Sequence, residues 1–218
     1  MQTQLSNQLA AKKRKRLLIA GIFTAAVVGA MAIDTKVIIN GSIEDLRQQA
    51  FSPDNYAKIN YPDIKQYVES NAVDATALLN ALREDKKAAG QKYGIGGGVG
   101  PVIPVSLEGT VTEGRSGIFK ISIPNFPDNQ TVRVQTGPAL NGTDLRDATG
   151  EIKFGKFKNQ IEYQDVGAAM NRVMKAEILD DLDRDNLVDK TVAITGVFRL
   201  INAKNWLITP VGMDVKWA

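Results

Sequence analysis

The chain contains neither cysteine nor histidine. Without cysteine it has no disulfide, no thiolate metal site and no cysteine that could carry a lipid. Without histidine it has no Ser-His-Asp or Cys-His catalytic group, none of the usual zinc sites and no imidazole to act as a general base near neutral pH. We therefore expect neither a metal nor a cofactor.

Serine offers no replacement nucleophile, because no serine is followed three residues later by the lysine that could activate it without histidine. An enzyme built on this chain would have to use carboxylates, lysine, tyrosine or an otherwise activated serine. We expect a protein that is not an enzyme. A hydrolase based on carboxylates is the least favoured alternative.

Acidic residues are missing before Asp34, and the basic run Lys12 to Arg16 carries five positive charges. Removing these five charges from the total of +3 leaves the rest of the chain at −2. A folded part with this balance gives no electrostatic reason to bind nucleic acid, and we expect no nucleic-acid partner.

An apolar run from Leu17 to Ile33 follows the basic residues, in the arrangement of an export signal or an N-terminal anchor. The run lies near the lower length limit for crossing a bilayer. Ala30 and Ala32 also have the spacing of a cleavage site after Ala32. Residues 1–33 thus predict a periplasmic protein held in the inner membrane by an uncleaved helix, with cleavage after Ala32 as the alternative.

Residues 34–93 favour a small helical segment. Val73, Ala77, Leu78, Ala81 and Leu82 recur at helical spacing, after Asp74 as a candidate N-cap and before Gly90 as a stop. Pro53 and Pro62 are expected to divide the preceding part into short helices. Residues 94–104 are rich in glycine and proline but complete no phosphate-binding pattern, and they predict a flexible connector.

Residues 105–218 change to a period of two. Three strands are expected around Val105–Val111, Phe119–Ile123 and Val132–Val134, then a helix from Val166, then two strands around Val192–Phe198 and Val211–Trp217. Three strands, a helix and two strands is the order of an OB-fold, a five-stranded barrel. The fold class is therefore mainly β with helices, and we expect residues 105–218 to fold as one such domain.

A polar loop from Gly137 to Gly150 interrupts this apolar pattern between the third strand and the helix. Its neighbourhood supplies donors and acceptors suited to recognising a small ligand or a partner. The candidates are Gln135, Thr143, Arg146, Asp147, Asn159, Gln160, Glu162 and Tyr163. The alternative is structural: Arg146 pairs with Asp147 or Glu162, and the amides satisfy backbone groups of the loop.

The motifs "NAVDATALLNAL", "AAGQKYG", "QTGPALNGTDLRDA" and "FKNQIEYQDV" occur in this order. They resemble the successive motifs of an uncharacterised bacterial family of predicted periplasmic lipoproteins, whose genes often lie beside those of carbohydrate ABC transporters. The resemblance covers Phe51 to the C terminus and implies a periplasmic location, with an ABC transporter or another envelope protein as partner. Asn141 and Asp144 stand where the pattern leads us to expect arginine and alanine, which weighs against an anionic ligand.

These observations together predict a non-enzymatic accessory protein of the cell envelope, associated with a sugar ABC-uptake system. The alternative is a periplasmic module that binds a small, carbohydrate-like ligand at the loop from Gly137 to Gly150. The resemblance also implies a lipid anchor, but this chain lacks the cysteine that would carry it. Any anchoring by this sequence therefore falls to Leu17–Ile33.

Overall fold

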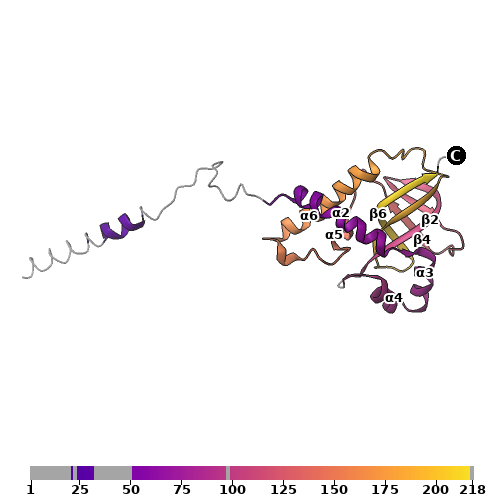
Figure 1. Cartoon of the computed structure of the whole chain (residues 1–218), viewed down its shortest axis with the longest axis horizontal. Helices are drawn as coiled ribbons and strands as arrows, with labels where there is room; N and C mark the ends of the chain where they lie inside the picture. The colour runs from indigo at the N-terminus through magenta and orange to yellow at the C-terminus, as the bar shows by residue number, and fades with distance from the viewer. Residues whose placement is uncertain (1–20, 22–23, 32–50, 97–98, 217–218) are drawn as a thin grey trace, which may run out of the picture. The chain divides into compact units, whose positions relative to one another are not determined.

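The computed structural model describes residues 21, 24–31, 51–96 and 99–216. The described residues from Phe51 onward form one compact unit (Figure 1). Of the expected Leu17–Ile33 anchor, only residues 21 and 24–31 are described; they are helical and exposed, and the rest of that prediction lies outside the described residues. Within the described ranges, no helix is long and apolar enough to cross a membrane.

Six strands of the compact unit form one mixed sheet with the order β1-β2-β3-β4-β6-β5. They are β1 (Val73–Asp74), β2 (Val102–Arg115), β3 (Ile118–Ser122), β4 (Thr131–Gln135), β5 (Thr191–Arg199) and β6 (Asn205–Lys216). Strand β2 also pairs with β5, so β2 to β6 close on one another. Two pairs of strands are parallel, β1 with β2 and β4 with β6, and the other pairs are antiparallel.

The expected order of three strands, a helix and two strands is confirmed. Alternation explains the strands, as in β3, where Phe119 and Ile121 are buried between more exposed neighbours. Strand β2 begins at Val102, inside the expected connector, because residues from Val102 onward pair with β5. The two-residue strand β1 was not predicted, because so short a segment shows no alternation.

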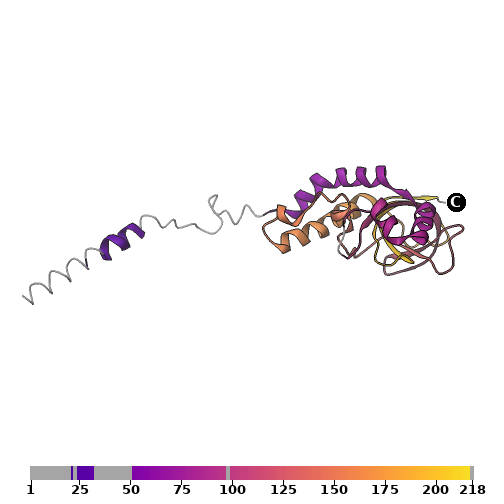
Figure 2. The same ribbon diagram turned by 90° about the horizontal axis from the view of Figure 1, so that it is seen from below.

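Helices cover the sheet. They are α2 (Pro53–Asn71), α3 (Ala75–Glu84), α4 (Lys86–Tyr93), α5 (Asp144–Asp147) and α6 (Gln160–Met174), with short turns η1 (Phe154–Lys156) and η2 (Lys175–Leu179). Helices α2 and α6 lie side by side (Figures 1 and 2). Asp74 caps α3 as predicted, accepting from the backbone N–H groups of Thr76 and Ala77. Helix α3 ends at Glu84 instead of Gly90, because Asp85 caps a new helix there.

The prediction that Pro53 and Pro62 divide this region into short helices is wrong. Pro53 opens α2, in the first position, where a helix makes no use of a backbone N–H group. Helix α2 then continues through Pro62 to Asn71. The loss of one backbone bond at Pro62 is outweighed because the neighbouring side chains Tyr61 and Ile64 are buried against the rest of the unit.

Two apolar clusters hold the unit together. The first contains the stacked rings of Phe198 and Trp206, 4.9 Å apart, and takes Leu78 from α3. The second packs α2 against α6 and includes Tyr61 and Met170, both almost fully buried. Because both clusters draw on helices before residue 94, residues 105–218 alone do not contain the complete core.

Candidate functional site

The loop from Gly137 to Gly150 leaves β4 beside Gln135 and returns through α5. Gln135 is buried, and its side chain holds the first half of the loop. Its Nε2 donates to the backbone oxygen of Asn141 at 3.2 Å and to Thr209 Oγ1 at 3.0 Å, and its Oε1 accepts from the Asn141 N–H at 3.2 Å. Gln135 thus acts here as a structural bridge from the loop to β6.

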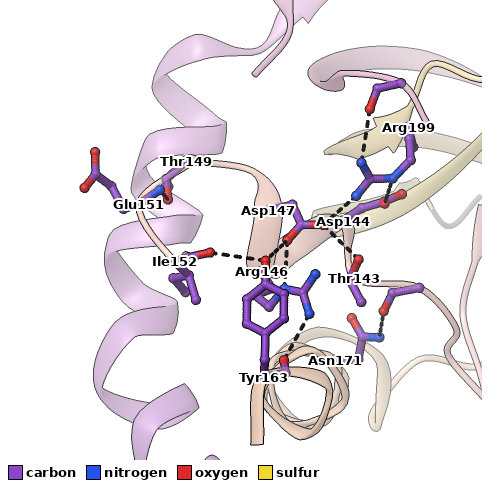
Figure 3. A network of polar contacts seen from close by, with 12 residues as sticks. Thr143, Asp144, Arg146, Asp147, Thr149, Glu151, Ile152, Tyr163, Asn171 and Arg199 are labelled. Carbon is purple, nitrogen blue, oxygen red and sulfur yellow. Dashed lines mark hydrogen bonds and ion pairs between the residues drawn. The ribbon is translucent and has the colours of Figure 1, made fainter. Parts of the chain in front are cut away.

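Arg146, on the single turn of α5, is 6% exposed. Its Nε donates to Asp147 Oδ1 at 2.7 Å, and its Nη1 donates to the backbone oxygen of Tyr163 at 3.0 Å. Its guanidinium carbon also lies 3.6 Å from the centre of the Tyr163 ring (Figure 3). The predicted pairing of Arg146 with Asp147 is therefore confirmed, and the arginine joins α5 to α6.

Arg199, the last residue of β5, meets the same turn from the sheet side (Figure 3). Its Nη2 donates to Asp147 Oδ2 at 2.6 Å, its Nε to Asp144 Oδ1 at 3.1 Å and its Nη1 to the Gly100 oxygen at 3.1 Å. Asp147 Oδ2 also accepts from the Thr143 hydroxyl at 2.8 Å. Two arginines and two aspartates thus form one network, which ties the loop to both the helix and the sheet.

The two carboxyl groups respond to this network in opposite ways. Burial acts to raise the pKa of Asp147, but hydrogen bonds from Arg146 and Thr143 and the charges of both arginines outweigh it, so its pKa is lowered. Burial is also the largest influence on Asp144, and its pKa is raised despite its contact with Arg199. The charged form is therefore favoured at Asp147 and disfavoured at Asp144.

The structure brings together four of the eight predicted site residues: Thr143, Arg146, Asp147 and Tyr163. The other four lie outside the network. Gln135 holds the first half of the loop. Asn159, Gln160 and Glu162 lie at the beginning of α6. Asn159 caps the helix by accepting from the Glu162 N–H at 2.9 Å, and the Glu162 carboxylate accepts from the Lys158 N–H at 3.0 Å.

Glu162 is thus a helix cap and is not a partner of Arg146. Gln160 is exposed, and no contact of its side chain is described. This part of the predicted set was grouped by sequence distance alone, because the residues that begin α6 lie close to Tyr163 in the chain. Asn159 and Glu162 instead accept from backbone N–H groups at the start of the helix.

Three contributors were missed by the sequence analysis: Asp144, Asn171 and Arg199. Asn171 is buried in α6 and donates to the Gly142 oxygen at 3.0 Å. Arg199 lies 52 positions from Asp147, and nothing near it in the sequence identifies its acceptor. The one available signal was that Arg199 is a charged residue at the end of an otherwise uncharged strand.

A shallow hollow of about 310 Å³ opens beside the network. It is lined by Ile95, Gly96, Asp147, Gly150, Ile152, Lys153, Phe154, Tyr163 and Arg199. A second hollow, of about 820 Å³ and mainly apolar, is lined by residues of α4, by Gly94, Gly96 and residues 99–101, and by Leu200. In the part of the chain that the structure describes, no cluster of three or more acidic side chains could hold a metal ion.

Comparison with solved structures shows the fold. The crystal structure of an OB-fold protein from Thermotoga maritima superposes with a TM-score of 0.63 and 18% sequence identity, covering 77% of this chain and 99% of that one. No curated protein matches the chain. A family model described as "Predicted periplasmic lipoprotein (DUF2291)" matches residues 23–214. The chain therefore belongs to this family of predicted periplasmic lipoproteins, whose function is unknown.

Proposed function

We propose that this protein is a non-catalytic accessory protein of the periplasm that works beside a sugar ABC-uptake system. The observation that supports a non-catalytic role is the closed pairing of charges. Arg146 and Arg199 donate to Asp147, Asp144 and backbone oxygens at 2.6–3.1 Å. Groups engaged in this way hold a loop in one shape and leave little for a reacting substrate.

Family membership and the resemblance in sequence motifs support the envelope role. We further infer that Leu17–Ile33 stays uncleaved and holds the chain at the inner membrane, with strands β2 to β6 forming an OB-like barrel on the periplasmic side. The mass of the mature chain tests the anchor directly. A mass that includes residues 1–32 supports it, and a chain that begins at Ile33 contradicts it.

Crosslinking in intact cells tests the accessory role. A photo-reactive amino acid is placed at the exposed Gln164, the residue after Tyr163 in α6, and at the exposed Gln91 of α4 as a matched glutamine control. We expect a specific crosslink from position 164 to a component of a sugar-uptake system. Loss of the protein should also slow uptake of that sugar. Crosslinks that are the same from both positions, with unchanged uptake, would contradict the proposal.

A second candidate is binding of a carbohydrate-like ligand at the hollow beside the network. The observation that favours it is the ring of Phe154, 50% exposed and 5.8 Å from the Tyr163 ring at the edge of the hollow. Calorimetric titration with neutral mono- and oligosaccharides tests this binding. Heat that is absent in Phe154→Ala would support it, whereas no heat in either protein would exclude it.

The carboxylate hydrolase remains the least favoured alternative. Asp144 and Asp147 have pKa values shifted in opposite directions, which is a feature of some acid–base pairs. Here Arg199 bonds both carboxylates. Hydrolysis of chromogenic glycosides that is lost in both Asp144→Asn and Asp147→Asn, with the fold intact, would overturn the non-catalytic proposal.

A further inference from the structure

A short segment of the compact unit combines exposed lysines with exposed apolar side chains. It is the Lys153–Ile161 loop, which contains η1 and the first two residues of α6. Phe154 is 50% exposed and Ile161 is 69% exposed. Lys153, Lys156 and Lys158 are exposed as well. Exposed apolar side chains together with lysines are typical of segments that lie in a membrane interface.

Aromatic packing of Phe157 against the rest of the compact unit holds the loop in place. Phe157 lies at its centre and contacts three rings, those of Phe51, Tyr56 and Tyr163, at centroid distances of 5.4 to 5.5 Å. At the end of the loop, Asn159 caps α6. Phe154 and Ile161 therefore stay exposed on a fixed backbone, and the packing of Phe157 does not bury them.

The charge of the loop is opposite to the net charge of the rest of the chain without the basic run. Without the basic run near the N terminus, the chain has a net charge of −2, yet this loop carries three lysines and no acidic residue. Among the described residues, none of the three lysine side chains has a hydrogen-bond or ion-pair partner. Their charges are available to an anionic surface.

The loop also lies where the chain enters the compact unit. Phe51 is the first residue of that unit, and its ring meets the Phe157 ring edge to face at 5.4 Å. The fifty residues before Phe51 include the basic run and the apolar Leu17–Ile33 segment, which predict contact with a membrane. A lipid surface is therefore the partner whose chemistry fits both the loop and the segment that leads to it.

We propose that the Lys153–Ile161 loop rests on an anionic phospholipid bilayer. Phe154 and Ile161 enter the region between headgroups and acyl chains, while Lys153, Lys156 and Lys158 contact lipid phosphates. Basic side chains near an anionic membrane strengthen contact several-fold each, and apolar side chains add to it by burial. The contact determines which face of the compact unit lies toward the membrane.

The absence of cysteine allows a clean test in the full chain, because a single introduced thiol is the only one present. Gly155→Cys places a polarity-sensitive fluorophore in the loop, and Gly212→Cys places it on β6 as the control. A side-chain carbon added at either glycine meets no atom within 4 Å. The labelled proteins are mixed with vesicles of phosphatidylglycerol and phosphatidylcholine, or of phosphatidylcholine alone, with and without brominated lipid.

We expect a blue shift and quenching by brominated lipid at position 155 on anionic vesicles, and much weaker changes at position 212. Insertion of Leu17–Ile33 tethers both labelled proteins through Phe51, and the lysine variants separate contact of the loop from this tethering. Equal responses at the two positions, or an equal response at position 155 on neutral vesicles, would overturn the proposal. If the fluorophore at position 155 is protected from water in cell membranes but shows no blue shift on protein-free vesicles, the proposal is overturned in favour of a protein partner.

Charge variants separate the loop from general attraction. Replacing Lys153, Lys156 and Lys158 by glutamine should shift the contact equilibrium measured at position 155 by on the order of a hundredfold. Replacing the exposed Lys87, Lys92 and Lys204 by glutamine removes the same charge elsewhere and should leave quenching nearly unchanged. Equal effects of the two triple variants would contradict a specific loop contact. Circular dichroism checks that each variant is folded.

Discussion

The guanidinium carbon of Arg146 lies 3.6 Å from the centre of the Tyr163 ring, and Nη1 of the same guanidinium donates to the Tyr163 backbone oxygen at 3.0 Å. One residue of α6 therefore meets both the flat face and the donor edge of the arginine. Arg146 also donates to Asp147, and Arg199 of β5 donates to the same carboxylate. The contact with Tyr163 therefore links α6, through α5, to the sheet.

We expect Arg146→Ala to lower the free energy of unfolding by about 1–3 kcal/mol, because it leaves Asp147 with one charged partner fewer and removes the stack on Tyr163. Arg146→Lys should recover only part of the loss, since an ammonium cannot present the planar donor fork. Urea denaturation measures both variants. Gln160→Ala, at an exposed position nearby, should change stability by less than about 0.5 kcal/mol. Equal stability of all three variants would show that the network does not contribute to the free energy of unfolding.

The two aspartates should differ in their effect on acid stability. The folded-state pKa of Asp147 is lowered from 3.8, so its contribution to stability is present above pH 3.8 and is lost as the pH falls through its folded pKa. The pKa of Asp144 is raised from 3.8, so its ionisation opposes folding as the pH rises from 3.8 through its folded pKa.

Unfolding free energies measured from pH 6 to pH 2 test this difference. In Asp147→Asn, the loss of stability below pH 3.8 should become shallower. In Asp144→Asn, the loss that accompanies rising pH just above 3.8 should disappear. The opposite assignment of the two changes would show that the carboxyl environments have been interpreted the wrong way round.

Gly117→Ala should destabilise the unit by more than about 3 kcal/mol. Gly117 has a φ of +74°, and a side-chain carbon there would lie 1.2 Å from the Gly137 oxygen. The backbone of Thr136 also donates to the Gly117 oxygen at 2.7 Å, so the turn cannot move away without breaking this bond. Thermal unfolding measures the loss, with the open position Gly155→Ala as the control. Similar melting temperatures for the two variants would contradict the close approach.

A fragment from Phe51 to Ala218 should fold cooperatively, whereas one from Pro101 to Ala218 should not. The shorter fragment lacks Leu78 and Tyr61, which are 0% and 1% exposed in the two apolar clusters. Removing α2, α3 and α4 would leave large apolar surfaces in water. Chemical denaturation and dye binding compare the fragments. A sharp transition of similar midpoint in both would show that the sheet is stable without α2, α3 and α4.

Local pattern was enough to predict the elements whose stability depends on neighbouring residues. Apolar alternation around Phe119 and Ile121 predicted β3, and the helical spacing after Asp74 predicted α3 with its cap. The order of these elements then indicated the OB-like fold, because few arrangements accommodate three strands, a helix and two strands. The pairing of Arg146 with Asp147 was within reach for the same reason, since the two are adjacent.

The tertiary structure alone decided the contacts between residues far apart in sequence. Pro62 remains within one helix because the side chains around it are buried by other elements, which outweighs a local preference. Arg199 reaches Asp147 because β5 ends against α5. Nothing in the sequence around Arg199 indicates that its acceptor lies 52 positions earlier. The sequence by itself determined which segments are strands and helices. Which charges meet, and which apolar side chains stay exposed, depended on how those segments pack.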